Sequence, residues 1–251
     1  MYPRRLATEI GLDASFLKCF APIHCIQTFL GSARININNN LVASVTFRQK
    51  LFSFIWIICF TSSVSYLILH HYKEYHDKNI IFCITTIIGV LIHYISYLCH
   101  MVHVRFFKSE SSAEVYLTIQ KMDYILPLKE YENLKRRQYY WNIILLILII
   151  LPFECGFVFY AKTMFDYPIL ATFGAIGLLT NYVDLLLTGS LIYYLTFRLK
   201  HLNKIGKIQS HRQRAFLLLD LDKFLLTLKE ILKSYKMITE TFSFTVSFLM
   251  Y

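Results

Sequence analysis

The stretch NIILLILIILPFECGFVFY, residues 142–160, decides the fold class of this chain. It contains no basic side chain and a single acidic one, Glu154, over almost the length that a helix needs to cross a bilayer core, roughly 20 residues. Three further apolar stretches occur, at residues 51–69, 80–104 and 168–197. The sequence therefore predicts an all-α, polytopic membrane bundle with four complete transmembrane helices.

Lysine and arginine lie almost entirely on one side of these stretches. Of the 26 basic residues, 23 precede the first stretch, fall in residues 105–141 or follow residue 197. Only Lys73, Lys78 and Lys162 occupy the other two connectors. Because basic residues are retained on the cytoplasmic face during insertion, both ends of the sequence are predicted to be cytoplasmic.

The composition argues against a soluble or nucleic-acid-binding protein. Hydrophobic residues make up 56% of the chain, whereas about 45–50% is usual for soluble domains. The net charge of +10 lies beside the spans, where anionic headgroups of the inner leaflet can neutralise it. The expected partner is therefore the lipid bilayer, with no nucleic acid, and the expected location is the cell membrane. The six cysteines lie in cytoplasmic or spanning segments and are expected to be free thiols.

The sequence divides into three segments. Residues 1–50 are predicted to form a cytoplasmic lead-in of short helices and turns, and residues 51–197 form the four-helix membrane bundle, in which ligands would be sensed. Residues 198–251 contain a basic turn and the start of a long cytoplasmic helix that leads into a fifth span. The uncharged run 241–251 is too short to cross a bilayer by itself, so we expect the chain to stop inside that span, truncated or partial.

Two cytoplasmic helices are predicted from apolar periodicity. In the second connector, the helical spacing is carried by Val115, Ile119, Met122 and Leu126. After residue 214 the apolar residues recur at spacings of four and three, which is typical of a coiled-coil seam. This predicted seam consists of Leu217, Leu221, Phe224, Leu228, Ile231 and Tyr235.

Charged groups deep in the bilayer are the first candidates for a functional site, because each costs roughly 2.5–3.5 kcal/mol even on permissive scales. At 1.5 Å per residue, His93 lies about 20 Å from the outer end of its span, and Asp184 lies about 24 Å from the outer end of its own. The two depths are nearly equal. We therefore expect His93 and Asp184 to face each other or a shared watery cavity, with Asn181 and Tyr182 adjacent.

A second group of polar residues lies nearer the outer surface. Glu154 follows Pro152, which removes one backbone donor and predicts a kink that opens local space. Together with Tyr66, Tyr160 and Asn181, Glu154 could line an outward-facing pocket for a small ligand. The alternative is that each of these groups only forms a hydrogen bond across a helix interface.

No enzymatic or metal-binding role is indicated. His70, His71 and His76 surround an outer connector, but they lack an accompanying thiolate or the His-Glu-x-x-His spacing that makes a metal site specific. The His-x-x-x-His boxes of membrane desaturases, a glycine-rich phosphate loop and a nucleophile elbow are all missing from the sequence. No catalytic residue, metal or other cofactor is predicted.

Several segments resemble one family, the insect gustatory receptors of the seven-helix chemoreceptor superfamily. FAPIHCIQTFLG, residues 20–31, is similar to the apolar segment ending in Leu-Gly that precedes the first helix of that family. LTIQKMDYIL at 117–126 resembles its cytoplasmic helix, and KRRQ at 135–138 resembles the basic entry to its third helix. LLTLKEIL at 225–232 and ETFSF at 240–244 resemble parts of its long fifth helix.

The resemblance implies a subunit of a ligand-gated cation channel that detects small-molecule tastants as a homo- or hetero-tetramer. It covers about the first two thirds of a typical member, and the final pore-lining helix has no counterpart in these residues, so this chain alone is not expected to conduct. Carried over by position, the candidate tastant-pocket residues are Tyr66, Glu154, Tyr160, Asn181 and Tyr182. Members of the family place the N-terminus in the cytoplasm, as the charge count also predicts.

Two other functions remain open. A G-protein-coupled receptor would require an external N-terminus, against which the basic-residue count argues. A small transporter could use His93 and Asp184 as a proton or substrate site near the bilayer midplane. Internal repeats would favour a transporter, and none is evident between the two helix pairs.

Overall fold

The protein is described by a computed structural model that is almost entirely helical, which confirms the all-α prediction. The described residues are 13–38, 41–43, 45–77, 79–107, 109–125, 130–164, 166–210 and 217–249. The elements before the first long connector are α1 (Ala14–Phe29), β1 (Asn36–Asn38), β2 (Leu41–Ala43), α2 (Phe47–Tyr75) and α3 (Ile80–Val102). They are followed by a π-helical turn η2 (His103–Phe107), α4 (Ser109–Ile125), α5 (Glu130–Met164), α6 (Pro168–Ser210) and α7 (Leu217–Leu249).

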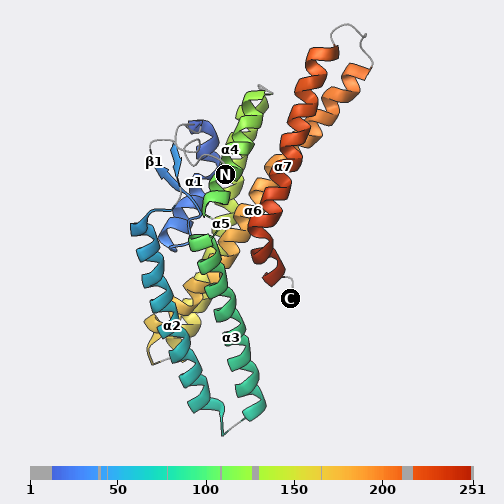
Figure 1. Ribbon diagram of the computed structural model, residues 1–251. Helices are drawn as coiled ribbons and strands as arrows, with labels where there is room; N and C mark the ends of the chain where they lie inside the picture. Colours follow the sequence, from blue (N-terminus) through green and yellow to red (C-terminus); the bar gives the residue numbers. More distant parts are fainter. Residues whose placement is uncertain are drawn as a thin grey trace.

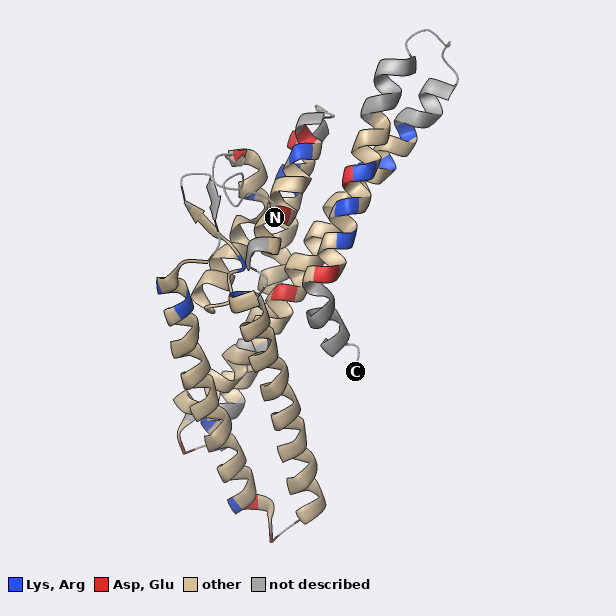
Figure 2. Cartoon of the chain, viewed as in Figure 1, with Lys and Arg blue, Asp and Glu red and all other residues tan. Residues whose placement is uncertain are grey.

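Within the described residues, four helices are long and apolar enough to cross a membrane, namely α2, α3 with η2, α5 and α6. Each contains one of the predicted spans. Large apolar side chains on α2, α3 and α5 are exposed, Ile55, Ile88 and Leu148 among them, as expected of helix faces that meet lipid. Figure 2 shows charged residues gathered at the end that holds α1, α4 and α7, while the far halves of α2 and α3 are almost free of charge.

Helix α6 is the most buried of the four long apolar helices. More than half of its most apolar segment is buried, against less than a quarter of the corresponding segment in each of the other three. Its first part lies beside α2, and its last part runs beside α7 at the opposite end (Figure 1). Small residues allow the close approach to α2, because a Cβ added at Gly177 would overlap the ring of Phe60. Ser63 Oγ also donates to the Leu170 carbonyl at 2.6 Å, which fixes the same interface.

Helix α1, within the predicted lead-in, contributes side chains to the buried core. It begins where the Asp13 carboxylate accepts a hydrogen bond from Ser15 N, and it ends in a Schellman motif in which Gly31 takes a positive φ of 69°. The buried rings of Phe16 and Phe20 contact Tyr116 of α4 and Tyr194 of α6 edge to face. The three segments expected from the sequence therefore share one apolar cluster that also includes residues of α5 and α7.

The short antiparallel hairpin β1–β2 follows α1 and pairs Asn36 with Ala43 and Asn38 with Leu41. Asn36 and Asn38 thus lie in a strand, although only short helices and turns were predicted for this part of the sequence. Helix α2 then begins with a capping box in which the Thr46 hydroxyl and the Gln49 side chain bond to each other's backbone N–H groups.

The two helices predicted from periodicity are present, but the buried face of α7 differs from the prediction at one position. In α4, Val115, Ile119 and Met122 are fully buried, as predicted, and Leu126 lies outside the described residues. In α7 the predicted seam is wrong at Tyr235, which is exposed, while Ser234 and Ile238 are buried. A straight helix has 3.6 residues per turn, so a stripe read at strict spacings of four and three drifts off the buried face. The side chains of Leu217 and Leu221 lie outside the described part.

All six cysteines are free, as predicted. Cys19 and Cys83 are buried, and the other four are exposed or half-buried. Burial in the apolar core strongly raises the pKa of the Cys19 thiol, so this side chain behaves as a small apolar group.

Candidate ligand pocket and buried charge cluster

A pocket of about 390 Å³ lies between α2, α3 and α6, with one wall from α5. This volume falls within the roughly 300–1,000 Å³ that small-molecule sites usually have. Its lining is mainly apolar, from Phe60, Val64, Leu67, Val90, Phe157 and Ala175, with Thr86, His71 and His93 as the polar groups and Gly89 and Gly174 as gaps. The lining residues of α6, and those of α3 apart from His93, come from the half of each helix nearest the connectors that are predicted to lie outside, and His93 lies just past the middle of α3.

The chemistry of a neutral His93 ring favours a ligand that donates a hydrogen bond. Its Nδ1 lies 2.8 Å from the carbonyl oxygen of Gly89, one turn earlier on α3. A carbonyl only accepts, so Nδ1 carries a proton, and in the neutral ring Nε2 is then an acceptor. The His93 side chain is exposed, so the pocket is not sealed from its surroundings. A hydroxyl or amine on a small ligand would suit this acceptor.

Tyr66 lies beside this pocket and contacts the connector before α6. Tyr66, Leu67 and Phe157 all pack against the buried Ala171, and Leu67 and Phe157 also line the pocket. The Tyr66 hydroxyl accepts a hydrogen bond from the backbone N–H of Tyr167 at 3.1 Å, which ties α2 to the turn before α6. The side chains of Glu154 and Tyr160, two other predicted pocket residues, lie outside the described part of the chain.

The predicted pairing of His93 with Asp184 is wrong. Asp184 is fully buried and forms an ion pair with Arg34, which follows α1, and its carboxylate also accepts a hydrogen bond from Gln27. The histidine beside it is His100, whose Nε2 lies 2.9 Å from Asp184 Oδ2. His100 and His93 lie on the same face of α3, two turns apart. Depth along each span was estimated as though all helices ran parallel to one axis, and this assumption selected the wrong histidine.

Other basic residues at this end of the molecule are buried among protein groups, although the sequence suggested lipid headgroups as their partners. Arg105 of η2 donates from Nε to the carbonyl of Gly31 at 2.7 Å. Arg198 of α6 is paired with Asp123 of α4 and lies 5.4 Å from the centre of the Tyr194 ring. Buried charges of this kind fix the packing of helices that are far apart in the sequence.

Lys135 of α5 forms a smaller network of polar contacts with two residues at the start of α1. Its ammonium group lies 2.8 Å from Asp13 Oδ2 and donates to Ser15 Oγ at 2.7 Å. Partial burial alone would raise the pKa of Asp13, but the hydrogen bonds from Lys135 and Ser15 outweigh burial and lower it to about 2. The Asp13 carboxylate therefore caps α1 in its charged form and joins that helix to α5.

His24 of α1 is buried, with its ring 5.3 Å from the ring of Tyr116. Burial outweighs the nearby Gln27 and Asp184 side chains, which favour a higher pKa of His24. Burial lowers the pKa of His24 to about 4 and raises that of Tyr116 well above its usual value, so both side chains are neutral.

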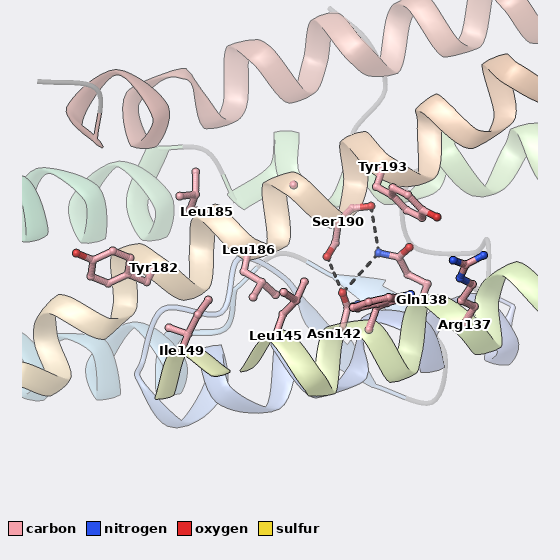
Figure 3. Close-up of a pocket in the computed structure, with 12 residues that line it drawn as sticks. Arg137, Gln138, Asn142, Leu145, Ile149, Tyr182, Leu185, Leu186, Ser190 and Tyr193 are labelled. Atoms are coloured by element: carbon pink, nitrogen blue, oxygen red, sulfur yellow. Dashed lines mark hydrogen bonds between the residues drawn. The ribbon is translucent and has the colours of Figure 1, made fainter. Parts of the chain in front are cut away.

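A second cavity, of about 510 Å³, is a groove between α5 and α6 (Figure 3). Tyr182 lines this groove, so the structure separates it from His93 and from Asp184. Asn181 is buried, and its Oδ1 has no hydrogen-bond partner among the described residues. Three of the predicted site residues thus fall into three different places: His93 lines the α2/α3/α6 pocket, Asp184 lies in the buried charge cluster and Tyr182 lines the α5/α6 groove.

Arg34, Gln27 and His100 are the residues of the charge cluster that were not predicted. A buried carboxylate needs a compensating cation, so a basic partner is required wherever Asp184 is buried. Nothing in the local pattern distinguished Arg34 from the other basic residues of the cytoplasmic segments. No cluster of three or more metal-ligating side chains occurs in the portion of the chain that was described.

Comparison of the chain with protein-family models, with curated proteins and with solved structures gives no significant match.

Proposed function

We propose that this protein is a membrane chemoreceptor of the gustatory type, a subunit of a ligand-gated cation channel that binds a small tastant. The observation that carries the proposal is the 390 Å³ pocket that extends from the predicted outer half of the four helices to His93 near the middle of α3. It combines aromatic and aliphatic walls with the acceptor Nε2 of His93, a setting that suits a small hydroxylated or amine-bearing organic molecule.

The transporter alternative loses its main support. It required His93 and Asp184 to share a site near the bilayer midplane, but the Asp184 carboxylate is occupied by Arg34, Gln27 and His100. A carboxylate held between a guanidinium and an imidazole is a structural anchor, because releasing it would leave buried Arg34 without a partner.

Filling the pocket tests the proposed ligand site. Gly89 lines the pocket, and a Cβ added there would meet no atom within 4 Å, so Gly89→Leu adds bulk without a clash at the first carbon. A ligand present at 100 times its Kd stabilises a protein by about 2.7 kcal/mol. We expect at least one compound from a panel of sugars and plant alkaloids to raise the unfolding midpoint of the purified protein, and Gly89→Leu to remove this shift.

The matched control is Gly156→Leu on α5, because Gly156 also has open space around its Cβ position but does not line the pocket. It should preserve the shift. If the panel stabilises none of the three proteins (the parent, Gly89→Leu and Gly156→Leu), or stabilises all three equally, the proposed site is contradicted. The channel part is tested separately, by cation currents evoked by the same compound in cells that express a receptor in which this chain is joined to a pore-lining helix, because the 251 residues alone are not expected to conduct.

The orientation of the N-terminus separates this proposal from a G-protein-coupled receptor. A short epitope tag before Met1 should be protected from antibody and protease in intact cells and should become accessible after the membrane is permeabilised. Labelling of intact cells would favour the G-protein-coupled alternative.

A further inference from the structure

The groove between α5 and α6 differs from the proposed ligand pocket in position and in electrostatics. It is lined by apolar side chains of both helices, including Leu145, Ile149 and Leu186, and Arg137 stands at one end. A smaller cavity of about 310 Å³ adjoins it and shares Arg137 and Trp141 with it. The second cavity adds Arg136 and Tyr140 to the same end. The combined surface therefore has a cationic end and an apolar body.

The length of the groove matches one leaflet of a bilayer. From Arg137 to Ile149, α5 rises about 18 Å at 1.5 Å per residue, and from Tyr193 to Tyr182, α6 spans about 16 Å. Half of the hydrocarbon core measures roughly 15 Å. If Arg137 lies at headgroup level, the groove reaches the midplane. Trp141 and Tyr140 lie next to the arginines, at the depth where such aromatic side chains are enriched.

The arginines at the end of the groove are available to an outside anion. Both Arg136 and Arg137 are exposed, and neither has a carboxylate within ion-pair distance among the described residues. The Arg136 guanidinium lies 6.0 Å from the centre of the Tyr140 ring, which holds it near the groove. This contrasts with Arg34, Arg105 and Arg198, which are all buried among protein groups.

Three polar side chains in the wall of the groove, Gln138, Asn142 and Ser190, leave one hydrogen-bond acceptor without a donor. Ser190 Oγ donates to Asn142 Oδ1 at 2.6 Å, and Asn142 Nδ2 donates to the Cys19 carbonyl at 2.7 Å. Gln138 Nε2 faces two acceptors at 3.5 Å, Asn142 Oδ1 and the Ser190 carbonyl. Its Oε1 is buried and has no hydrogen-bond partner in the described part of the chain. This oxygen lies one residue from Arg137, near the predicted headgroup level.

We propose that the α5/α6 groove binds one anionic phospholipid of the cytoplasmic leaflet, with its phosphate at Arg136 and Arg137 and one acyl chain along Leu145, Leu186 and Ile149. A headgroup that carries an amine or hydroxyl, as phosphatidylserine does, supplies the donor that Gln138 Oε1 lacks. The site rests on the insertion of the four spans in a bilayer and is independent of the proposed tastant pocket. Because α6 also forms one wall of that pocket, the lipid would hold α5 against the helix that carries both sites.

The two tryptophans of the chain allow a direct test. Trp141 lines the groove, whereas Trp56 lies on α2. The variant Trp56→Phe therefore leaves one fluorophore at the site. It would be reconstituted in phosphatidylcholine vesicles that contain a small fraction of phosphatidylserine brominated on its acyl chains, or the same fraction of brominated phosphatidylcholine. We expect brominated phosphatidylserine to quench Trp141 much more strongly than brominated phosphatidylcholine, because each basic side chain near the surface contributes about fivefold to the binding of anionic lipid.

Two variants in this background locate the site. Arg136→Gln with Arg137→Gln should reduce the preference for phosphatidylserine by about 25-fold in relative affinity, that is, to near equality. Gly189→Leu should abolish it, since Gly189 lines the groove and has open space around its Cβ position. Gly156→Leu, which fills open space outside the groove, should keep the preference unchanged.

Equal quenching by the two lipids in the Trp56→Phe protein overturns the proposal, as does a preference that survives the arginine substitutions or Gly189→Leu. Circular dichroism and a single gel-filtration peak establish that each variant is folded. Because quenching is measured without any tastant, the lipid site and the proposed receptor function succeed or fail separately.

Discussion

The Asp184 carboxylate of α6 forms a fully buried ion pair with the Arg34 guanidinium, which lies 150 residues earlier in the chain, just after α1. Arg34 Nε donates to Asp184 Oδ2 at 3.0 Å, and Arg34 Nη1 donates to the Thr241 carbonyl of α7 at 3.5 Å. One side chain thus joins the segment after α1 to α6 and α7.

Asp184→Leu should destabilise the fold strongly, because it leaves the guanidinium of Arg34 buried without its counter-charge. The expected loss is about 3–5 kcal/mol in the free energy of unfolding. It can be measured by titrating the purified protein with SDS in mixed micelles. The double variant Arg34→Met with Asp184→Leu should recover much of the loss, since it removes both charges. Asp166→Asn, at an exposed position before α6, should stay within about 0.5 kcal/mol of the parent protein. A double variant no more stable than Asp184→Leu would argue against the pair.

Gly177→Ala should destabilise the interface between α2 and α6. An added Cβ overlaps the Phe60 ring, and overpacking of this kind costs about 1–3 kcal/mol. Gly156→Ala on α5 should instead increase the stability of the protein. No atom lies near the added Cβ, and replacing an unhindered helical glycine by alanine is favourable by about 1 kcal/mol. Thermal unfolding followed by circular dichroism measures both. Phe60→Leu in the Gly177→Ala background should restore part of the lost stability, and two glycine variants that shift equally would refute the close approach.

Stability should fall as the pH drops from 6.5 to 4 because of His24. Its pKa is lowered by burial to about 4 in the folded protein, against a usual value of 6.5, so in this window the unfolded state binds a proton that the folded state does not. The shift corresponds to a loss of about 3 kcal/mol across the window. His24→Phe should flatten this part of the pH profile, while His76→Gln, in the exposed outer connector, should not. An unchanged profile in His24→Phe would exclude His24 as the titrating group.

Asp13 should contribute stability in a different pH range. Its folded pKa of about 2 is below the usual 3.8, so its charged contacts stabilise the fold above pH 3.8 and are lost as the pH falls through 2. Asp13→Ala should cost about 1 kcal/mol or more at pH 7, because it removes both the cap of α1 and the partner of Lys135. Asp13→Asn should keep the cap and lose only the charge. The difference in unfolding free energy between Asp13→Asn and the parent protein, measured by denaturant titration, should therefore vanish near pH 2. A difference that persists there would show that the loss comes from altered packing and not from the lost charge.

Much of the architecture could be predicted from local sequence patterns. The four apolar runs lie within four long helices, and the periodicity of Val115, Ile119 and Met122 identifies the buried face of α4. The pattern in α7 was less reliable, because a buried stripe on a 3.6-residue helix drifts and Tyr235 is carried out of the interface. Contacts of α1 could not be predicted in this way, since its aromatic residues pack against helices about 100 and 180 residues away in sequence.

The sequence by itself determined the number of long apolar helices, the gathering of charge at one end and the free state of the cysteines, because each of these follows from composition and spacing along a single segment. Only the tertiary structure decided which charges meet. Helices cross at angles and depths that local spacing does not encode, so Asp184 is paired with Arg34 and lies beside His100, not His93. The same packing separates Tyr182 from His93 and places them in two different cavities, one with an arginine at its end and one without.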